Sequence, residues 1–418
     1  MKIVEAADLD LSAYIRAGDM VTWGQASAEP QTLVETLIEQ RHDLGGVDAF
    51  VGLSLSGLLK PEHCDAIRPV SYGALGTTRA LQAVGKLRLI PAHYSTLPHL
   101  MRSGALPVDV ALVQLSPPGP DGSHSLGFCA DLMQAALDRA RVVIAEINDR
   151  VPWTRMGKPF DASRVDVAIE VSRPVADREP PVPGDVERRV AEHVAGVIRD
   201  GATLQYGVGA IPAAIFEALR SHRDLGLHTG LLTEDVIDLY ECGAMTNARK
   251  PVHTGIGVGS LVIGGERVRR FLHDNPELEL HPVEVTHNPT ILGRIDNLVA
   301  INSAVEVDLY GQVNAERLGD RHVGAIGGQV DFMHAGAVAE NGLSIIAMPS
   351  SSGKSGASRI VSRLNSPAVT TARADVDMVV TEHGVADLRG KTEDEVSAAL
   401  IAIAPPEHRD ALRASWTG

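Results

Sequence analysis

The chain has 418 residues, too many for one ordinary hydrophobic core, so we expect two domains of roughly 200 residues each. Hydrophobic residues make up 44% and charged residues 22%, a balance that excludes a disordered or fibrous chain. The formal net charge of −15 comes without any run of Lys or Arg, which argues against a nucleic-acid-binding function.

The cysteines and the N-terminus bear on compartment and metal content. Cys64, Cys129 and Cys242 have spacings that match neither a disulfide framework nor a zinc site, so we expect no metal and a reducing cytoplasm. The first residues lack an apolar signal-peptide region, and no segment has the roughly 18 apolar residues of a membrane span. We therefore expect a cytoplasmic protein without a membrane partner.

The first part of the chain alternates apolar runs with amphipathic segments. The Val- and Ile-rich runs predict buried strands at 20–23, 47–53, 87–91, 108–115 and 142–147. Helices are predicted at 31–40 and 131–139. This alternation is typical of a largely parallel sheet covered on both faces, so the first domain, residues 1–175, is predicted to be α/β.

A proline-rich stretch, 173–185, contains four prolines in thirteen residues and is predicted to be a linker. After it, Asp185 is predicted to cap a helix whose Val186, Val190, Val194 and Val197 form an apolar stripe. Strands are predicted at 203–206, 298–301, 344–348 and 378–381. Residues 186–418 are therefore predicted to form a second α/β domain. We expect a ligand to bind between the domains at the strand carboxyl ends.

Three segments are too rich in glycine to be explained by turns alone: 207–212 (GVGAIP), 324–329 (GAIGGQ) and 350–356 (SSSGKSG). Glycine lets main-chain amides approach a ligand closely, and successive N–H groups bind anionic oxygens. The last segment is not a nucleotide-triphosphate loop, because Met348 stands where the first glycine of that motif is needed. Each segment alone is equally compatible with a strand-to-helix turn.

Together, the ordered motifs resemble a known family. The segments 207–212, 224–229 (DLGLHT), 301–313 (INSAVEVDLYGQV), 327–332 (GGQVDF) and 381–390 (TEHGVADLRG), with 109–113 and 125–127, are similar to the acetyl-CoA hydrolase/transferase family. That family includes acetate, butyrate and 4-hydroxybutyrate coenzyme A-transferases. The resemblance implies two open α/β domains of the CoA-transferase type with the active site between them, and most CoA-binding loops in the second. It also implies an acyl-CoA thioester substrate, a small-molecule acceptor and no further cofactor.

The same resemblance implies site residues. Loop positions in the family suggest that the amides of Gly209 and Gly328 are oxyanion donors for the thioester. We expect the following residues to bind CoA or the oxyanion: Gly207, Gly209, Gly327, Gly328, Gln329, Ser352 and Lys354. His334 stands where the family commonly has an arginine, and it is either a site residue or an ordinary loop histidine.

One position departs from the family's chemistry. Its transferases use a glutamate, directly after a His-Thr pair, whose carboxylate attacks the thioester and forms a glutamyl-CoA intermediate. Here His228-Thr229 is followed by Gly230, which has no side chain. Matches on both sides of this position fix the alignment, so Gly230 is predicted to occupy the position of the glutamate.

Three hypotheses follow from Gly230. Glu234 or Glu241 could replace the lost carboxylate, although a predicted helix at 233–241 would carry both away from it. The enzyme could instead deliver the acyl group directly to water or another nucleophile, the reading we favour. Third, the chain could be an engineered or inactivated transferase, or a non-catalytic CoA-binding relative. Oligomeric state stays open, with a homo-oligomer compatible with the sequence.

Direct attack needs a base, and His228 is the nearest candidate, although a histidine at a strand end commonly makes structural hydrogen bonds. Cys242 could be a nucleophile, but its context favours a buried, inert thiol. Glu306 and Asp308 share one face of an apolar strand, where they either orient active-site groups or accept hydrogen bonds from loop amides.

Overall fold

The computed structural model describes residues 1–353 and 355–417, which form two compact units. The first unit comprises Met1–Glu179, Gly230–Glu234 and Val258–Thr286. The second comprises Pro180–Thr229, Asp235–Gly257 and His287–Gly418. The first unit therefore contains two segments that follow the linker in sequence. Within the described residues, no helix is long and apolar enough to cross a membrane.

The first unit is organised around one parallel sheet of eight strands in the order β1-β8-β7-β6-β2-β3-β4-β5. Its strands are β1 (Lys2–Val4), β2 (Met20–Trp23), β3 (Val47–Phe50), β4 (Ile67–Ser71), β5 (Arg88–Leu89), β6 (Val110–Leu115), β7 (Val142–Asn148) and β8 (Val167–Val171). All five strands predicted for this part of the chain are present, several of them shorter than expected. Every residue of β6 and β7 is buried, as expected for central strands covered on both faces.

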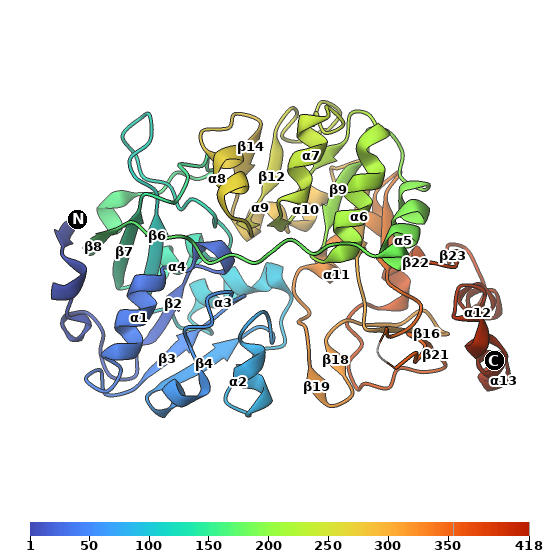
Figure 1. Cartoon of the computed structure of the whole chain (residues 1–418), viewed down its shortest axis with the longest axis horizontal. Coiled ribbons are helices and arrows are strands. Elements are labelled where there is room, and N and C mark those ends of the chain that lie inside the picture. The colour runs from blue at the N-terminus through green and yellow to red at the C-terminus, as the bar shows by residue number, and fades with distance from the viewer. Residues whose placement is uncertain (354, 418) are drawn as a thin grey trace. The chain divides into compact units, whose positions relative to one another are not determined.

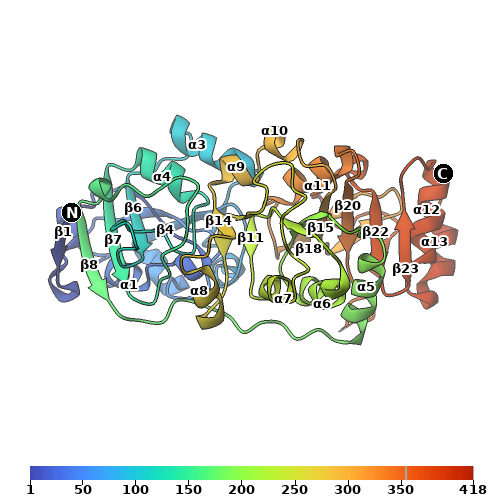
Figure 2. The same cartoon turned by 90° about the horizontal axis from the view of Figure 1, so that it is seen from above.

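Helices cover both faces of this sheet. They are α1 (Gln31–Glu39), α2 (Arg79–Ala83), α3 (Leu97–Ser103) and α4 (Met133–Arg139). Figure 2 shows α3 and α4 on one face and α1 on the other. The helix predicted at 131–139 begins two residues late, because the Asp131 carboxylate lies before it and accepts the N–H of Met133 at 3.2 Å.

The later segments of the first unit attach to its loops by main-chain hydrogen bonds. They contain β11 (Leu231–Leu232), β13 (Leu261–Val262), β14 (Leu278–Leu280), α8 (Glu266–Leu272) and α9 (Val283–Thr286), and β14 pairs with β12 (Gly257–Gly259). The N–H of Val262 donates to the Phe128 carbonyl at 2.9 Å. The N–H of Leu280 donates to the Arg155 carbonyl, also at 2.9 Å. Figure 1 shows α8, α9 and β14 in yellow.

Residues 172–184 form neither helix nor strand, as their prolines predict. The following helix, α5 (Asp185–Ala195), buries Val190 and Val194 of the predicted stripe. The predicted cap is wrong by one residue: Gly184 is the N-cap, and the Glu187 carboxylate accepts its N–H at 3.0 Å. Asp185 is the first helical residue, where its charge favours the positive end of the helix dipole.

The second unit has a six-stranded sheet in the order β10-β9-β15-β20-β22-β23. Its strands are β9 (Thr203–Tyr206), β10 (Gly226–Leu227), β15 (Leu298–Asn302), β20 (Leu343–Ala347), β22 (Met378–Thr381) and β23 (Gly384–Asp387). All pairs are parallel except β22 with β23. The four strands predicted here are confirmed.

This sheet is also covered on both faces. Figure 2 shows α5, α6 (Ala210–Ala218) and α7 (Asp235–Glu241) on one face and α11 (Gln329–Val338) on the other. The unit also contains α10 (Pro289–Leu292), α12 (Glu393–Ala402) and α13 (Arg409–Ser415), and the short strands β16 (Glu306–Asp308), β17 (Val313–Asn314), β18 (Arg317–Leu318), β19 (Arg321–His322) and β21 (Ile360–Val361). Its core combines Leu298 and Ala300 of β15, Ile346 of β20, Val379 of β22 and Phe332 of α11.

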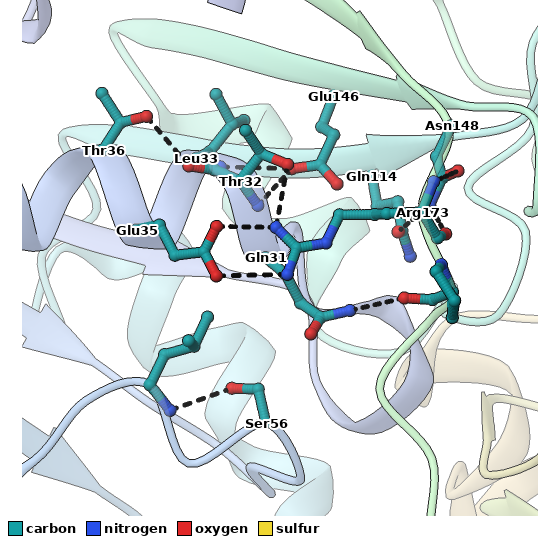
Figure 3. A network of polar contacts seen from close by, with 12 residues as sticks. Gln31, Thr32, Leu33, Glu35, Thr36, Ser56, Gln114, Glu146, Asn148 and Arg173 are labelled. Carbon is teal, nitrogen blue, oxygen red and sulfur yellow. Dashed lines mark hydrogen bonds and ion pairs between the residues drawn. The ribbon is translucent and has the colours of Figure 1, made fainter.

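A buried carboxylate joins the first sheet to α1 (Figure 3). Glu146, on β7, is fully buried, and its Oε2 accepts the N–H groups of Thr32 and Leu33 at 2.8 and 3.1 Å. Its Oε1 has no hydrogen-bond partner. Burial raises the pKa of Glu146 to about 7. The hydrogen bonds from the two N–H groups and the charge of Arg173 lower this pKa, but burial has the larger effect. Arg173 forms an ion pair with Glu35 at 2.7 Å.

We expect Glu146→Gln to remove part of the pH dependence of stability. The pKa of Glu146 is raised from 4.5 to about 7 in the folded state, so its stabilising contribution is complete below pH 4.5 and is lost as pH rises through 7. The loss corresponds to about 3 kcal/mol at most. Glutamine keeps an acceptor for Thr32 but does not ionise.

Urea unfolding followed by circular dichroism near pH 5 and near pH 8 measures this difference. The unfolding free energy of the variant should fall less between the two pH values than that of the unmodified chain. Glu35→Gln, at a partly exposed carboxylate on α1, is the matched control and should keep the wild-type pH dependence. Equal pH dependence in the Glu146 variant and the wild type would contradict the assignment.

Candidate functional site

The strand order of the second sheet reverses between β9 and β15. From β9 the chain runs through α6 to β10 on one side, whereas β15, β20 and β22 follow on the other. Open α/β sheets bind ligands outside the strand carboxyl ends at such a switch point. The segments that follow β9, β10 and β15 are therefore the candidate ligand-binding region of this unit.

The glycine loop after β9 lies beside the end of β15. A Cβ added at Gly207 would be 3.8 Å from Oδ1 of Asn302, whose Nδ2 donates to Gln205 at 2.9 Å. Gly209 is the N-cap of α6 and has a φ of 135°, a conformation that favours glycine. The loop thus places the amino-terminal end of α6, with the N–H groups of Ala210 and Ile211, at the carboxyl edge of the sheet.

The second glycine loop begins α11. Gly327 has a φ of 56°, Gly328 is the N-cap, and Nε2 of Gln329 donates to Oγ1 of Thr371 at 3.1 Å. A helix that connects parallel strands starts at their carboxyl ends, so α6 and α11 begin at the same edge on opposite faces (Figure 2). Gly207, Gly209, Gly327, Gly328 and Gln329 therefore all lie at this edge.

The segment before Gly230 is held rigidly. His228 and Thr229 follow β10 and are fully buried, and the His228 N–H donates to the Leu204 carbonyl at 3.0 Å. Beneath them, the buried Lys250 ammonium donates to the carbonyls of Leu227 and Ile256 at 2.7 and 2.6 Å. Charged groups are rarely buried without such partners, so this lysine fixes the end of β10.

Gly230 and Glu234 pack with the first unit. The Gly230 carbonyl accepts the N–H of Leu261 at 3.0 Å. Glu234 lies before α7, which starts at Asp235, two residues later than predicted, and its carboxylate is 3.6 Å from the guanidinium of Arg267.

Glu306 and Asp308 accept hydrogen bonds from nearby loops. Glu306 accepts from the N–H of Asn365 at 3.0 Å and from the side-chain amides of Asn365 and Asn314, both at 3.1 Å. Asp308 accepts from the N–H groups of Gln312 at 2.9 Å and Tyr310 at 3.1 Å. These contacts match the loop-anchoring alternative.

Two other candidates lie in exposed surroundings. Ser352 belongs to an exposed loop in which its N–H donates to the Ala357 carbonyl at 2.8 Å, and the candidate Lys354 lies outside the described residues. His334 is on the exposed side of α11, where its ring contacts the Asp375 carboxylate at 2.8 Å. The structure does not bring His334 to the Gly327–Gly328 turn.

The expectation for Cys242 is wrong in one respect. Its thiol is exposed, because the residue lies just beyond the end of α7, and it approaches the carbonyls of Leu239 and Arg220 at 3.6 and 3.8 Å. Sequence alone could not separate the buried and exposed sides of so short a helix.

A buried polar cluster of the first unit was not predicted. Tyr94 and Gln25 donate to Oδ2 of Asp131 at 2.8 and 2.5 Å, and the Cys129 thiol donates to Oδ1 at 2.8 Å. Tyr72 completes the cluster by donating to Gln25 at 2.8 Å. Burial raises the pKa of Asp131, although the thiol and the hydroxyl oppose the shift. The cluster joins loops that follow several strands of the first sheet.

Two α/β units, the second with glycine loops at its strand carboxyl ends, place the protein among open α/β proteins that can bind ligands through main-chain amides. Comparison with known families makes this more specific. Residues 2–175 match the acetyl-CoA hydrolase/transferase N-terminal domain, and residues 264–416 match the C-terminal domain of the same name. The chain belongs to the acetyl-CoA hydrolase/transferase family, whose members are CoA transferases and hydrolases.

Individual relatives agree with this assignment. The chain is 37% identical to the 4-hydroxybutyrate coenzyme A transferase of Clostridium kluyveri over 94% of this chain and 92% of that protein. The solved 4-hydroxybutyrate CoA-transferase of Porphyromonas gingivalis has a TM-score of 0.83 and 34% identity, covering 99% and 96% of the two chains. RipA of Yersinia pestis has a TM-score of 0.93 and 29% identity with the same coverage. The predicted fold class is thereby confirmed.

We expect Glu306→Ala to destabilise the second unit. The change leaves the Asn365 N–H and two side-chain amides without their acceptor, which costs roughly 2–3 kcal/mol of unfolding free energy. Urea unfolding measures the effect. Glu340→Ala, at an exposed carboxylate of the same unit, serves as control and should change stability by less than about 0.5 kcal/mol. Equal effects of the two changes would count against the anchoring role.

Proposed function

We propose that the protein is an acyl-CoA enzyme that transfers the acyl group of a bound thioester directly to water or a small-molecule acceptor. No glutamyl-CoA intermediate forms on this route. The proposal depends on one observation: Gly230 directly follows His228-Thr229, so the position has no carboxylate to attack the thioester.

The nearby carboxylates are poor substitutes. Glu234 is held near Arg267, and Glu241 is the last residue of α7, a seven-residue helix. A helix of that length spans about 10 Å, so Glu241 lies far along the chain from Gly230. Neither geometry supports a covalent intermediate on a replacement glutamate.

The glycine loops support thioester binding. The N–H groups around Gly209 and Gly328 would hold phosphate or thioester oxygens, because fixed main-chain amides stabilise negative charge without reorganising. A relative named acetyl-CoA hydrolase, from Kluyveromyces lactis, is 29% identical over 61% of this chain. Acyl delivery to water is therefore an activity ascribed to a protein similar to this one.

In the hydrolytic form of the reaction, the water oxygen attacks the thioester carbon and the C–S bond breaks. Water loses a proton to a base, and the CoA thiolate takes one up, so the products are a carboxylic acid and free CoA. His228 is the base candidate nearest in sequence to Gly230.

Thiol release distinguishes direct attack from CoA transfer. We expect acetyl-CoA or butyryl-CoA to give free CoA, detected with a thiol reagent, without an added carboxylate. With butyryl-CoA, a carboxylate CoA-transferase would require acetate and would form acetyl-CoA and butyrate instead of free thiol. A non-catalytic CoA-binding protein would show neither. Thioester exchange with acetate through an adduct on Glu234 or Glu241 would overturn the proposal.

We also expect Gly230→Glu to create a covalent intermediate. Gly230 is not among the described glycines with a positive φ, so a glutamate requires no left-handed backbone there. Incubation with acetyl-CoA should give a CoA adduct, seen by intact-protein mass spectrometry and removed by hydroxylamine.

Gly230→Gln is the matched control for this experiment, because it has nearly the same size but no nucleophilic carboxylate. It should give no adduct, and neither should the unmodified protein. An adduct on the unmodified chain would show that another residue supplies the nucleophile. Absence of an adduct on the glutamate variant would mean that position 230 does not face the thioester.

A further inference from the structure

His287 lies against the first turn of α11 in the second unit. Its side chain is buried, with 3% of the residue exposed. The ring packs on Phe332 of α11 with 4.7 Å between ring centroids and 60° between planes. Burial lowers the pKa of His287 to about 3, so the imidazole is neutral in the physiological range.

The same ring lies beside Gly328, on the side where a side chain would project. A Cβ added at Gly328 would lie 2.4 Å from Nε2 and 2.7 Å from Cδ2 of His287, closer than real Cβ contacts permit. Position 328 therefore requires glycine because of the imidazole, whereas Gly327 requires it because of its φ of 56°. The Nε2 edge of His287 fills the space where a side chain at 328 would lie.

The two contacts of His287 are on one face of α11. Gly328 and Phe332 are separated by four residues, about one helical turn, so the ring spans the start of the helix. A neutral ring suits this place, because an imidazolium would face the positive end of the helix dipole. The ring therefore packs beside the first turn of α11 at both Gly328 and Phe332.

We propose that His287 is a positioning residue that fixes the Gly327–Gly328 turn, so that the Gly328 amide can stabilise the oxygen of the attacked thioester. This inference rests on the proposed function. Oxyanion donors must be held in place before the reaction, and a displacement of about 1 Å can cost about 100-fold in rate. The role differs from that of His228, which lies after β10 at another strand end.

Two variants separate positioning from packing. The side-chain amide of His287→Gln reaches the place of Nε2 and keeps the contact with Gly328. The shorter amide of His287→Asn reaches only the place of Nδ1 and leaves a gap there. Both remove the ring from Phe332, so both should lose similar thermal stability.

The first measurement is the hydrolysis of acetyl-CoA or butyryl-CoA. We expect kcat to fall about 10- to 100-fold in His287→Asn with little change in KM, and to stay within a few-fold of wild type in His287→Gln. The second measurement is amide hydrogen exchange of peptides that cover 324–331, which requires no turnover. Exchange should be faster in His287→Asn than in His287→Gln.

Equal kcat and equal exchange in the two variants would overturn the positioning role and leave packing on Phe332 as the function of the ring. If the unmodified protein hydrolyses no acyl-CoA, the hydrolytic form of the proposed function fails. The exchange comparison then decides by itself whether His287 fixes the turn.

Discussion

Parallel strand pairing is the constraint on which the candidate site depends. In the second unit it directs the carboxyl ends of β9, β10, β15, β20 and β22 to one edge, and the helices α6 and α11 start there. The reversal of strand order next to β9 leaves room at this edge for two glycine loops. Residues distant in sequence, such as Gly207 and Asn302, are neighbours for this reason alone.

Two buried side chains hold the segments near the candidate site, in contrast to Gly230. The buried Lys250 fixes the end of β10, and His287 lies against the turn that begins α11. The end of β10 and the start of α11 are thus each fixed by a buried side chain, whereas Gly230 itself contributes no side chain. In the function proposed above, this glycine changes the reaction while the fold of the family is kept.

Much of this fold follows from local pattern. The strands at 20–23, 203–206 and 378–381 have the predicted limits, and every residue in them is buried. The roles of side chains that depend on contacts in three dimensions could not be predicted from local sequence pattern. The ammonium of Lys250 can be buried because the carbonyls of Leu227 and Ile256 accept hydrogen bonds from it, and the position of His287 is informative because Gly328 lies beside it. No periodicity in the sequence carries that information, and the exposure of Cys242 also depends on packing beyond its helix.

The discontinuity of the first unit has a consequence for synthesis of the chain. The N–H of Ala130 donates to the Ser260 carbonyl, and that of Gly157 to Leu280, so its early loops find their partners more than a hundred residues later. A ribosome that has completed the linker has not yet made Val258–Thr286. The loops of the amino-terminal half therefore stay unpaired until β9 and β10 of the second sheet have been translated. A fragment cut at the linker would retain the large sheet but keep those loops permanently open.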